Sequence, residues 1–270
     1  MHQLFILIAV GLVVAACATD GSRSPGSGAF DIATRTPGHP ALQTSENAAP
    51  LEQGILVERR ENMVLYRGGL TEKGLEALRS IGNDPGVTTL LIDSTGGEIV
   101  LGMQFGDWVI DRELDVVIDR ACLSSCANYI FTAGRNKKIM PGAVVAWHGS
   151  AKQPGLLDQL NELVEEQIAS RNLSPAERQR ALKRARKANV AYLTAAIYRQ
   201  DRFFFRVGVD EYVTRIGNDK YGVRGFFYLS VPDMATFGIN QVTAADNYAE
   251  MEPNALSQRV GFPVTLVELK

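Results

Sequence analysis

Residues 87–118 read VTTLLIDSTGGEIVLGMQFGDWVIDRELDVVI, and this stretch decides the fold class. Two aliphatic runs, 87–92 and 116–118, flank a segment with helical hydrophobic spacing at 99–111. Apolar runs without polar alternation are typical of strands that helices cover on both faces. The stretch therefore predicts a β–α–β unit of an α/β protein.

The same alternation extends on both sides of this unit. Upstream, a strand is expected at 63–66 and a helix at 70–81; downstream, a helix at about 125–133 and a strand at 143–147. Two later apolar runs, 226–229 and 238–242, are expected to be returning strands.

A long helical region is expected from about 155 to 205. It is interrupted near Asn172 by Ser174-Pro175-Ala176-Glu177, in which serine can cap a helix, proline fits its first turn and glutamate can complete a capping box. We therefore expect a helical hairpin here.

The composition is that of an ordinary globular protein. The 270 residues include 28 Lys and Arg against 30 Asp and Glu, giving a net charge of -2, and 46% are hydrophobic. Nothing in this balance favours binding to nucleic acid, which needs clustered excess positive charge. One basic run at 178–187 can be read as an anionic-lipid or nucleic-acid patch, but its charges occupy several faces of the predicted helix, which favours an ordinary solvated surface.

The N-terminal segment resembles a bacterial lipoprotein signal. Residues 4–16 form an apolar run too short to span a bilayer, and it ends at Cys17 in the lipobox-like sequence Val-Ala-Ala-Cys. We expect a signal peptide at 1–16, a lipidated Cys17 with a Ser-, Gly- and Pro-rich tether at 17–50, and a folded domain at 51–270. This predicts a location in the bacterial cell envelope facing the periplasm, at the outer membrane if the organism is Gram-negative. A plain signal peptide or a membrane anchor stays open, because residues 1–3 carry no Lys or Arg.

Three short segments carry residues that could perform chemistry. They are 94–97 (Ser-Thr-Gly-Gly), 122–126 (Cys-Leu-Ser-Ser-Cys) and 147–149 (Trp-His-Gly), and each follows a predicted strand. Parallel sheets place their sites at such carboxyl ends. Glycine pairs can expose backbone N–H groups to an oxyanion, and a serine at a helix start can be activated by a histidine. Since His2 and His39 precede the folded domain, His148 is the only histidine available for this role.

Each of these elements also has a purely structural interpretation. A glycine pair is commonly a turn, a serine at a helix start is commonly a cap, and a histidine at a strand end is commonly structural. The four-residue separation of Cys122 and Cys126 permits a disulfide in an oxidising compartment, and two buried thiols are the alternative. A metal site with His148 lacks a fourth ligand, so we expect no metal and no cofactor.

Together, these segments resemble a known family. The stretch LLIDSTGGEIVLGMQFGDWVI, followed by VVIDRACLSSCANYIFTAG and MPGAVVAWHGS, resembles the Clp-type serine protease and crotonase superfamily, above all periplasmic Clp-protease-like proteins with a C-x-S-x-C motif. The match covers roughly 63–150 and returns at 228–242. The resemblance implies a Clp-protease/crotonase-like spiral of ββα units, here with a long helical insertion.

The resemblance also implies roles for individual residues. Gly97 matches the oxyanion glycine and His148 the general base. Alignment on the helix end at 132–134 selects Ser125 as nucleophile, with the Cys126 amide as second oxyanion donor, whereas alignment on the paired cysteines selects Ser124. We favour Ser125 because a gap inside a packed helix is costly.

The acidic member of the triad is where the chain departs from the family. At the matching position it has Phe226, and an aromatic ring cannot orient an imidazole as a carboxylate does. Asp219 is the possible substitute, and Asn240 could orient a neutral histidine.

These observations support an ATP-independent serine peptidase of the envelope that acts on a peptide or protein substrate. The alternative is a catalytically inactive scaffold or peptide-binding lipoprotein, whose long helices would allow it to form a homo-oligomer. A crotonase-like acyl-CoA enzyme is disfavoured because acyl-CoA is cytoplasmic. The expected partners are the membrane, through Cys17, and no nucleic acid.

Overall fold

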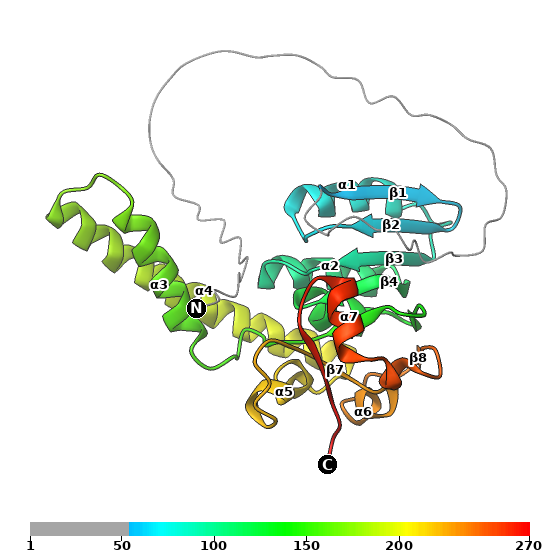
Figure 1. Cartoon of the computed structure of the whole chain (residues 1–270). Helices are drawn as coiled ribbons and strands as arrows, with labels where there is room; N and C mark the ends of the chain where they lie inside the picture. The colour runs from blue at the N-terminus through cyan, green and yellow to red at the C-terminus, as the bar shows by residue number, and fades with distance from the viewer. Residues whose placement is uncertain (1–53) are drawn as a thin grey trace.

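A computed structural model describes residues 54–270, arranged as helices packed around a mostly parallel sheet (Figure 1). The predicted signal peptide, Cys17 and the tether lie outside the described residues. The α/β class predicted from the sequence is confirmed. No helix among residues 54–270 combines the length and the apolar character needed to cross a membrane.

The main sheet has seven strands in the order β1-β2-β3-β4-β5-β8, and β6 also pairs with β4. All neighbours are parallel except β1 and β2, which form an antiparallel pair. A separate two-stranded parallel sheet joins β7 to β9. The strands are β1 (Leu56–Arg60), β2 (Met63–Arg67), β3 (Thr89–Ser94), β4 (Asp115–Leu123), β5 (Lys137–Ile139), β6 (Val144–Ala146), β7 (Phe226–Leu229), β8 (Val242–Thr243) and β9 (Val264–Val267).

Helices follow most of the parallel strands, and the longest two form the predicted hairpin. The second hairpin helix begins with the predicted capping box, in which Ser174 and Glu177 bond to each other's backbone N–H. In Figure 1 this hairpin projects away from the sheet. The helices are α1 (Glu72–Gly82), α2 (Ile99–Asp111), α3 (Leu156–Ala169), α4 (Pro175–Val207), α5 (Ile216–Asp219), α6 (Val231–Thr236) and α7 (Pro253–Val260), with short turns η1 (Cys126–Phe131), η2 (Glu211–Thr214) and η3 (Tyr248–Glu250).

The predicted strand at 238–242 was wrong over most of its length. Only Val242 and Thr243 are extended, as β8. Gly238 has φ +83° and Gln241 has φ +57°, and such left-handed backbone interrupts an extended chain. Strands β5 and β9 and helix α7 were not predicted, because they are short and lack a clear hydrophobic period.

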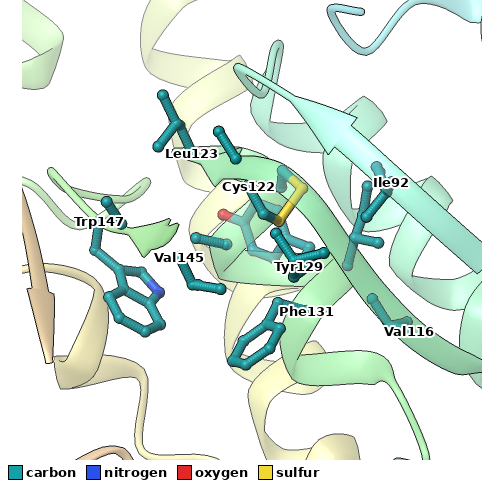
Figure 2. Close-up of a cluster of buried hydrophobic side chains, with 14 of the residues drawn as sticks. Ile92, Val116, Cys122, Leu123, Tyr129, Phe131, Val145 and Trp147 are labelled. Atoms are coloured by element: carbon teal, nitrogen blue, oxygen red, sulfur yellow. A yellow bond between two sulfur atoms is a disulfide. The ribbon is translucent and has the colours of Figure 1, made fainter. Parts of the chain in front are cut away.

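The core lies between the sheet and the helices that follow β3 and β4. Figure 2 shows part of it, where Ile92, Val116 and Val145 from three strands meet Tyr129 and Phe131 of η1. These side chains are almost completely buried, and each contributes about 1.5–3 kcal/mol of hydrophobic stabilisation. The residues that follow β4 are therefore held by core packing on one side.

Helix α2 can approach η1 and α4 closely because its inner side carries glycine. A Cβ atom at Gly106 would lie 2.6 Å from the Tyr129 carbonyl oxygen and 2.7 Å from a ring carbon of Phe203. Gly102 meets the Ser125 side chain in the same way, at 2.8 Å. Helix packing on the segment that contains Ser125 thus depends on these two glycines.

We expect Gly106→Ala to lower the free energy of unfolding by about 1–3 kcal/mol, because overpacking outweighs the roughly 1 kcal/mol gain in helix propensity. Urea unfolding followed by circular dichroism measures the change. Gly54→Ala is the control, since a Cβ there meets no atom within 4 Å. Equal stability of the two variants would contradict the packing argument.

Candidate active site

The three segments selected from the sequence meet at one edge of the sheet. Ser94 at the end of β3 pairs with Cys122 of β4, and Leu123 at the end of β4 pairs with Ala146 of β6. The residues that follow β3, β4 and β6 therefore lie close together, because neighbouring parallel strands end at the same edge of the sheet. The Ser124 amide donates to the Ala146 carbonyl at 3.0 Å, which fixes the serine turn against the histidine segment.

His148 is in direct contact with Ser124. The distance from His148 Nε2 to Ser124 Oγ is 2.7 Å, and both residues are partly accessible to solvent. This is hydrogen-bonding distance for a nucleophile and its general base. Ser124 and His148 are therefore within hydrogen-bonding distance of each other and partly exposed to solvent.

The structure brings Ser124, the alternative candidate, to His148 and places the hydroxyl of Ser125 elsewhere. The Ser125 hydroxyl is 2.7 Å from the carbonyl oxygen of Gly97 and donates to it, and Ser125 is only 2% exposed. Ser125 therefore has a structural hydrogen bond and little access to a substrate. The sequence favours Ser125 because the helix at 125–133 aligns without a gap. In the structure, the conformation of the turn before η1 determines which hydroxyl lies next to His148.

Ser124 has an unusual backbone. Its φ is +56°, in the left-handed region that residues with a Cβ atom seldom adopt. It lies between the last residue of β4 and the first turn of η1, so the chain reverses sharply at this residue. A strained serine between a strand and a helix is the arrangement of a nucleophile elbow, which exposes the hydroxyl above the sheet.

Gly96 allows the neighbouring loop to pack against this turn. A Cβ at Gly96, whose φ is +90°, would lie 2.5 Å from the Leu123 carbonyl oxygen and 2.9 Å from the Ser125 amide nitrogen. Gly97, the predicted oxyanion residue, instead faces Leu70, and its carbonyl accepts the Ser125 hydroxyl. Both glycines are required sterically, but only Gly96 is pressed against the serine turn.

The Cys122–Cys126 disulfide spans the serine turn, with a Cα–Cα distance of 5.2 Å. Figure 2 shows it within the buried cluster, and both cysteines are fully buried. By the loop-closure argument a cross-link of this short span stabilises the fold by about 2 kcal/mol. No group of three or more metal-binding side chains occurs in the described part of the chain.

Phe226 lies against the His148 ring. The ring centroids are 4.6 Å apart with an interplanar angle of 59°. The cause is strand pairing: Trp147 and Phe227 exchange two backbone hydrogen bonds of 2.8 Å in an antiparallel bridge, so the next pair is His148 with Phe226. Phe226 therefore lies beside the histidine because of this strand pairing.

Neither suggested replacement for the acid reaches His148. Asp219 pairs with Arg215 at 3.2 Å, and Asn240 uses its side-chain amide on the Gly238 carbonyl at 3.2 Å. Among residues 54–270, the only hydrogen bond of the His148 side chain is the one to Ser124. Burial lowers the pKa of His148 to about 4, so the ring is neutral at physiological pH.

Two buried polar residues support the site, and the sequence analysis missed both. Asn128 is 2% exposed. Its side-chain Nδ2 donates to the Gly149 carbonyl at 2.9 Å, and its backbone N–H donates to the Ser124 carbonyl at 2.9 Å. It thereby connects the serine turn to the residue after His148. The available signal was an amide side chain within the otherwise apolar run 126–131.

Asp93 is the second of these residues, and it lies at a register shift between β3 and β4. Its carboxylate is fully buried, accepts the Ala121 amide at 3.2 Å and lies 3.2 Å from Arg120 Nε. Burial raises the pKa of Asp93, and the nearby Arg120 and Arg67 oppose this effect. Asp93 satisfies an amide that the irregular ladder leaves unpaired, just before the Ser94 loop.

Helix α4 holds the segment after His148 from the other side. Gln200 is completely buried and accepts hydrogen bonds from Tyr129 Oη at 2.7 Å and the Ala151 amide at 3.1 Å. Its own amide group donates to Ser150 Oγ at 3.2 Å. The long helical insertion is therefore part of the support of this site.

No protein-family model matches the chain, and no curated protein matches it. The chemical interpretation therefore depends on the geometry described above.

The backbone at Ser124 makes a prediction that separates the two serines. Both Ser124→Ala and Ser124→Gly remove the hydroxyl, but we expect the glycine variant to be more stable by about 1 kcal/mol, because left-handed backbone penalises a Cβ atom. At Ser125, with φ -59°, we expect the opposite order. Urea unfolding of the four variants measures both differences. Alanine more stable than glycine at position 124 would rule out the left-handed turn.

Proposed function

We propose that this chain is a serine hydrolase of the Clp-protease-like kind, which cleaves peptide bonds without ATP. The observation that carries the proposal is the 2.7 Å contact of His148 Nε2 with Ser124 Oγ at a left-handed turn between strand and helix. A structural hydroxyl–imidazole pair does not require a strained backbone. Strain of this kind persists where the surrounding structure enforces it, and it concentrates at active sites.

In the proposed reaction, Ser124 Oγ attacks the carbonyl carbon of the scissile peptide bond while its proton passes to His148 Nε2. The negative charge on the carbonyl oxygen is stabilised by backbone N–H groups, for which the Ser125 amide and the Gly97 amide are the candidates. The second donor thus moves from Cys126 to Ser125, because it is the residue after the nucleophile. His148 then protonates the departing amine, and water hydrolyses the acyl-enzyme by the same steps in reverse.

The missing carboxylate predicts a slow enzyme. During attack His148 becomes positively charged, and no acidic side chain in the described residues contacts it. The same desolvation that keeps its pKa near 4 disfavours this charged form. The neutral ring is always available as a base near pH 7, but it is a weak base.

Further parts of the proposal concern the fold family and the location. The parallel ladder of β2, β3 and β4, with the candidate site at its carboxyl end, supports a Clp-protease/crotonase-like spiral. The Cys122–Cys126 disulfide supports an oxidising compartment, since such bonds are rare in the cytosol. With the lipobox-like sequence, this supports an envelope lipoprotein that is anchored through Cys17 and faces the periplasm.

A second candidate is an inactive scaffold or peptide-binding lipoprotein. The observation in its favour is that Phe226 packs on His148 where the family has its acid. Such a protein keeps the arrangement of Ser124 and His148 but does not turn over substrate.

Labelling with a fluorophosphonate probe distinguishes the two. We expect the wild-type chain to be labelled, and Ser124→Ala and His148→Ala to abolish labelling. Ser125→Ala is the matched control and should keep most of it, because its hydroxyl faces Gly97. Loss of labelling in Ser125→Ala alone, or no labelling of a folded wild-type chain, would sink the Ser124 hydrolase.

Phe226→Asp tests the missing acid directly. A carboxylate opposite His148 stabilises the imidazolium, so we expect the labelling rate to rise at least about tenfold. It also raises the pKa of His148, so the midpoint of the rate against pH should move upward from about 4. Phe226→Asn is the uncharged control of nearly the same shape, and thermal unfolding checks that both variants fold. An aspartate variant that labels no faster than the asparagine variant contradicts the assignment.

A further inference from the structure

One side of α4 points away from the rest of the molecule. The residues that face α3 include Leu182, Ala185 and Asn189, and Asn189 donates to the Asn161 side chain at 3.0 Å. At 3.6 residues per turn, the opposite side carries Arg180, Lys183, Arg184, Lys187, Tyr198, Asp201, Arg202 and Phe205, which we call the outward face. In Figure 1 the half of α4 nearer the hairpin turn extends beyond the sheet.

The first half of the outward face is basic. Its four cations have the spacing i, i+3, i+4, i+7, which places them on one stripe, and all four are exposed. The basic run as a whole does occupy several faces, since Arg178 and Arg186 lie off this stripe, but these four cations share one side. Within residues 54–270, the basic side chains of α4 that form ion pairs are Arg186, Arg199 and Arg206, none of which is on this stripe. The stripe is thus a local excess of positive charge on a chain of net charge -2.

The second half of the outward face carries two exposed aromatic rings together with Asp201 and Arg202, and Val190 lies at its edge. Val190 is 50% exposed, Tyr198 is 64% exposed and Phe205 is 90% exposed. Tyr198 and Phe205 also line a surface hollow of about 900 Å³ beside α2. Phe205 in particular leaves most of its ring in contact with solvent.

We infer that the outward face of α4 lies on the surface of a bilayer that contains anionic phospholipids. A helix with Lys and Arg followed by exposed aromatic residues on the same face has the two features that bind such a surface: attraction to lipid phosphates and partial burial of apolar side chains at the headgroup level. Nucleic acid would also match the cations, but the chain as a whole has no excess of positive charge to favour it. The inference does not depend on the hydrolase activity.

The test uses the full chain with Phe205→Trp and vesicles of phosphatidylcholine with phosphatidylglycerol whose acyl chains are brominated. Bromine quenches only tryptophan that enters the bilayer, and the two native tryptophans, Trp108 and Trp147, are 5% and 0% exposed. The readout therefore reports on α4 and not on attachment through the N-terminal segment. We expect strong quenching and a blue shift of the new tryptophan, both absent with phosphatidylcholine alone.

Charge removal completes the design. Neutralising Arg180, Lys183, Arg184 and Lys187 to Gln should weaken the quenching response by about 10²-fold or more in lipid concentration, since each cation near an anionic surface contributes substantially. The matched control, Arg178→Gln with Arg186→Gln, removes two cations of the same helix that lie off the stripe, and it should change the response little. An equal loss of quenching in both variants overturns the inference. Shielding of the new tryptophan without lipid, as protein concentration rises, also overturns it and identifies a second copy of the chain as the partner.

Discussion

Ser124 can lie under His148 only because the chain leaves β4 through a left-handed residue. A right-handed or extended backbone at this position would carry the hydroxyl along the strand direction or into the core. Three contacts enforce the conformation: Gly96 leaves space for the turn, the Cys122–Cys126 disulfide closes it, and the Asn128 amide bonds to the Ser124 carbonyl. The site therefore depends on backbone geometry more than on the identity of one side chain.

The sequence predicts the frame of the fold because its apolar runs are long enough to be read. Most of the aliphatic residues in 87–92 and 116–118 are buried, and this produces a nearly uninterrupted hydrophobic signal. The hairpin was predictable for another reason, since Ser174, Pro175 and Glu177 specify a helix start locally. Strands β5 and β9 have four residues or fewer, and their extension comes from pairing with distant segments, which one sequence does not display.

For the candidate site, the sequence identified the residues that come together but not which serine contacts His148. His148 followed from elimination, yet the choice between Ser124 and Ser125 depends on one φ angle that no local pattern encodes for serine. Phe226 illustrates the opposite case, because alignment predicted its position and the Trp147–Phe227 bridge explains it. Asp93, Asn128 and Gln200 escaped attention since a single buried polar residue becomes meaningful only when its partners, far away in sequence, are known.

Helix α4 has two sides with different surroundings. Its inward residues, Gln200 among them, hold the segment after His148, while its other side is exposed over most of its length. Each residue added to or removed from a helix rotates everything beyond it by about 100°. Natural variation in the length of α4 between Lys187 and Gln200 should therefore come in steps of seven or eleven residues, which return the helix to nearly the same phase. Shorter changes would turn one side of the helix away from its contacts, so the helical repeat limits which lengths of this segment keep both sides in place.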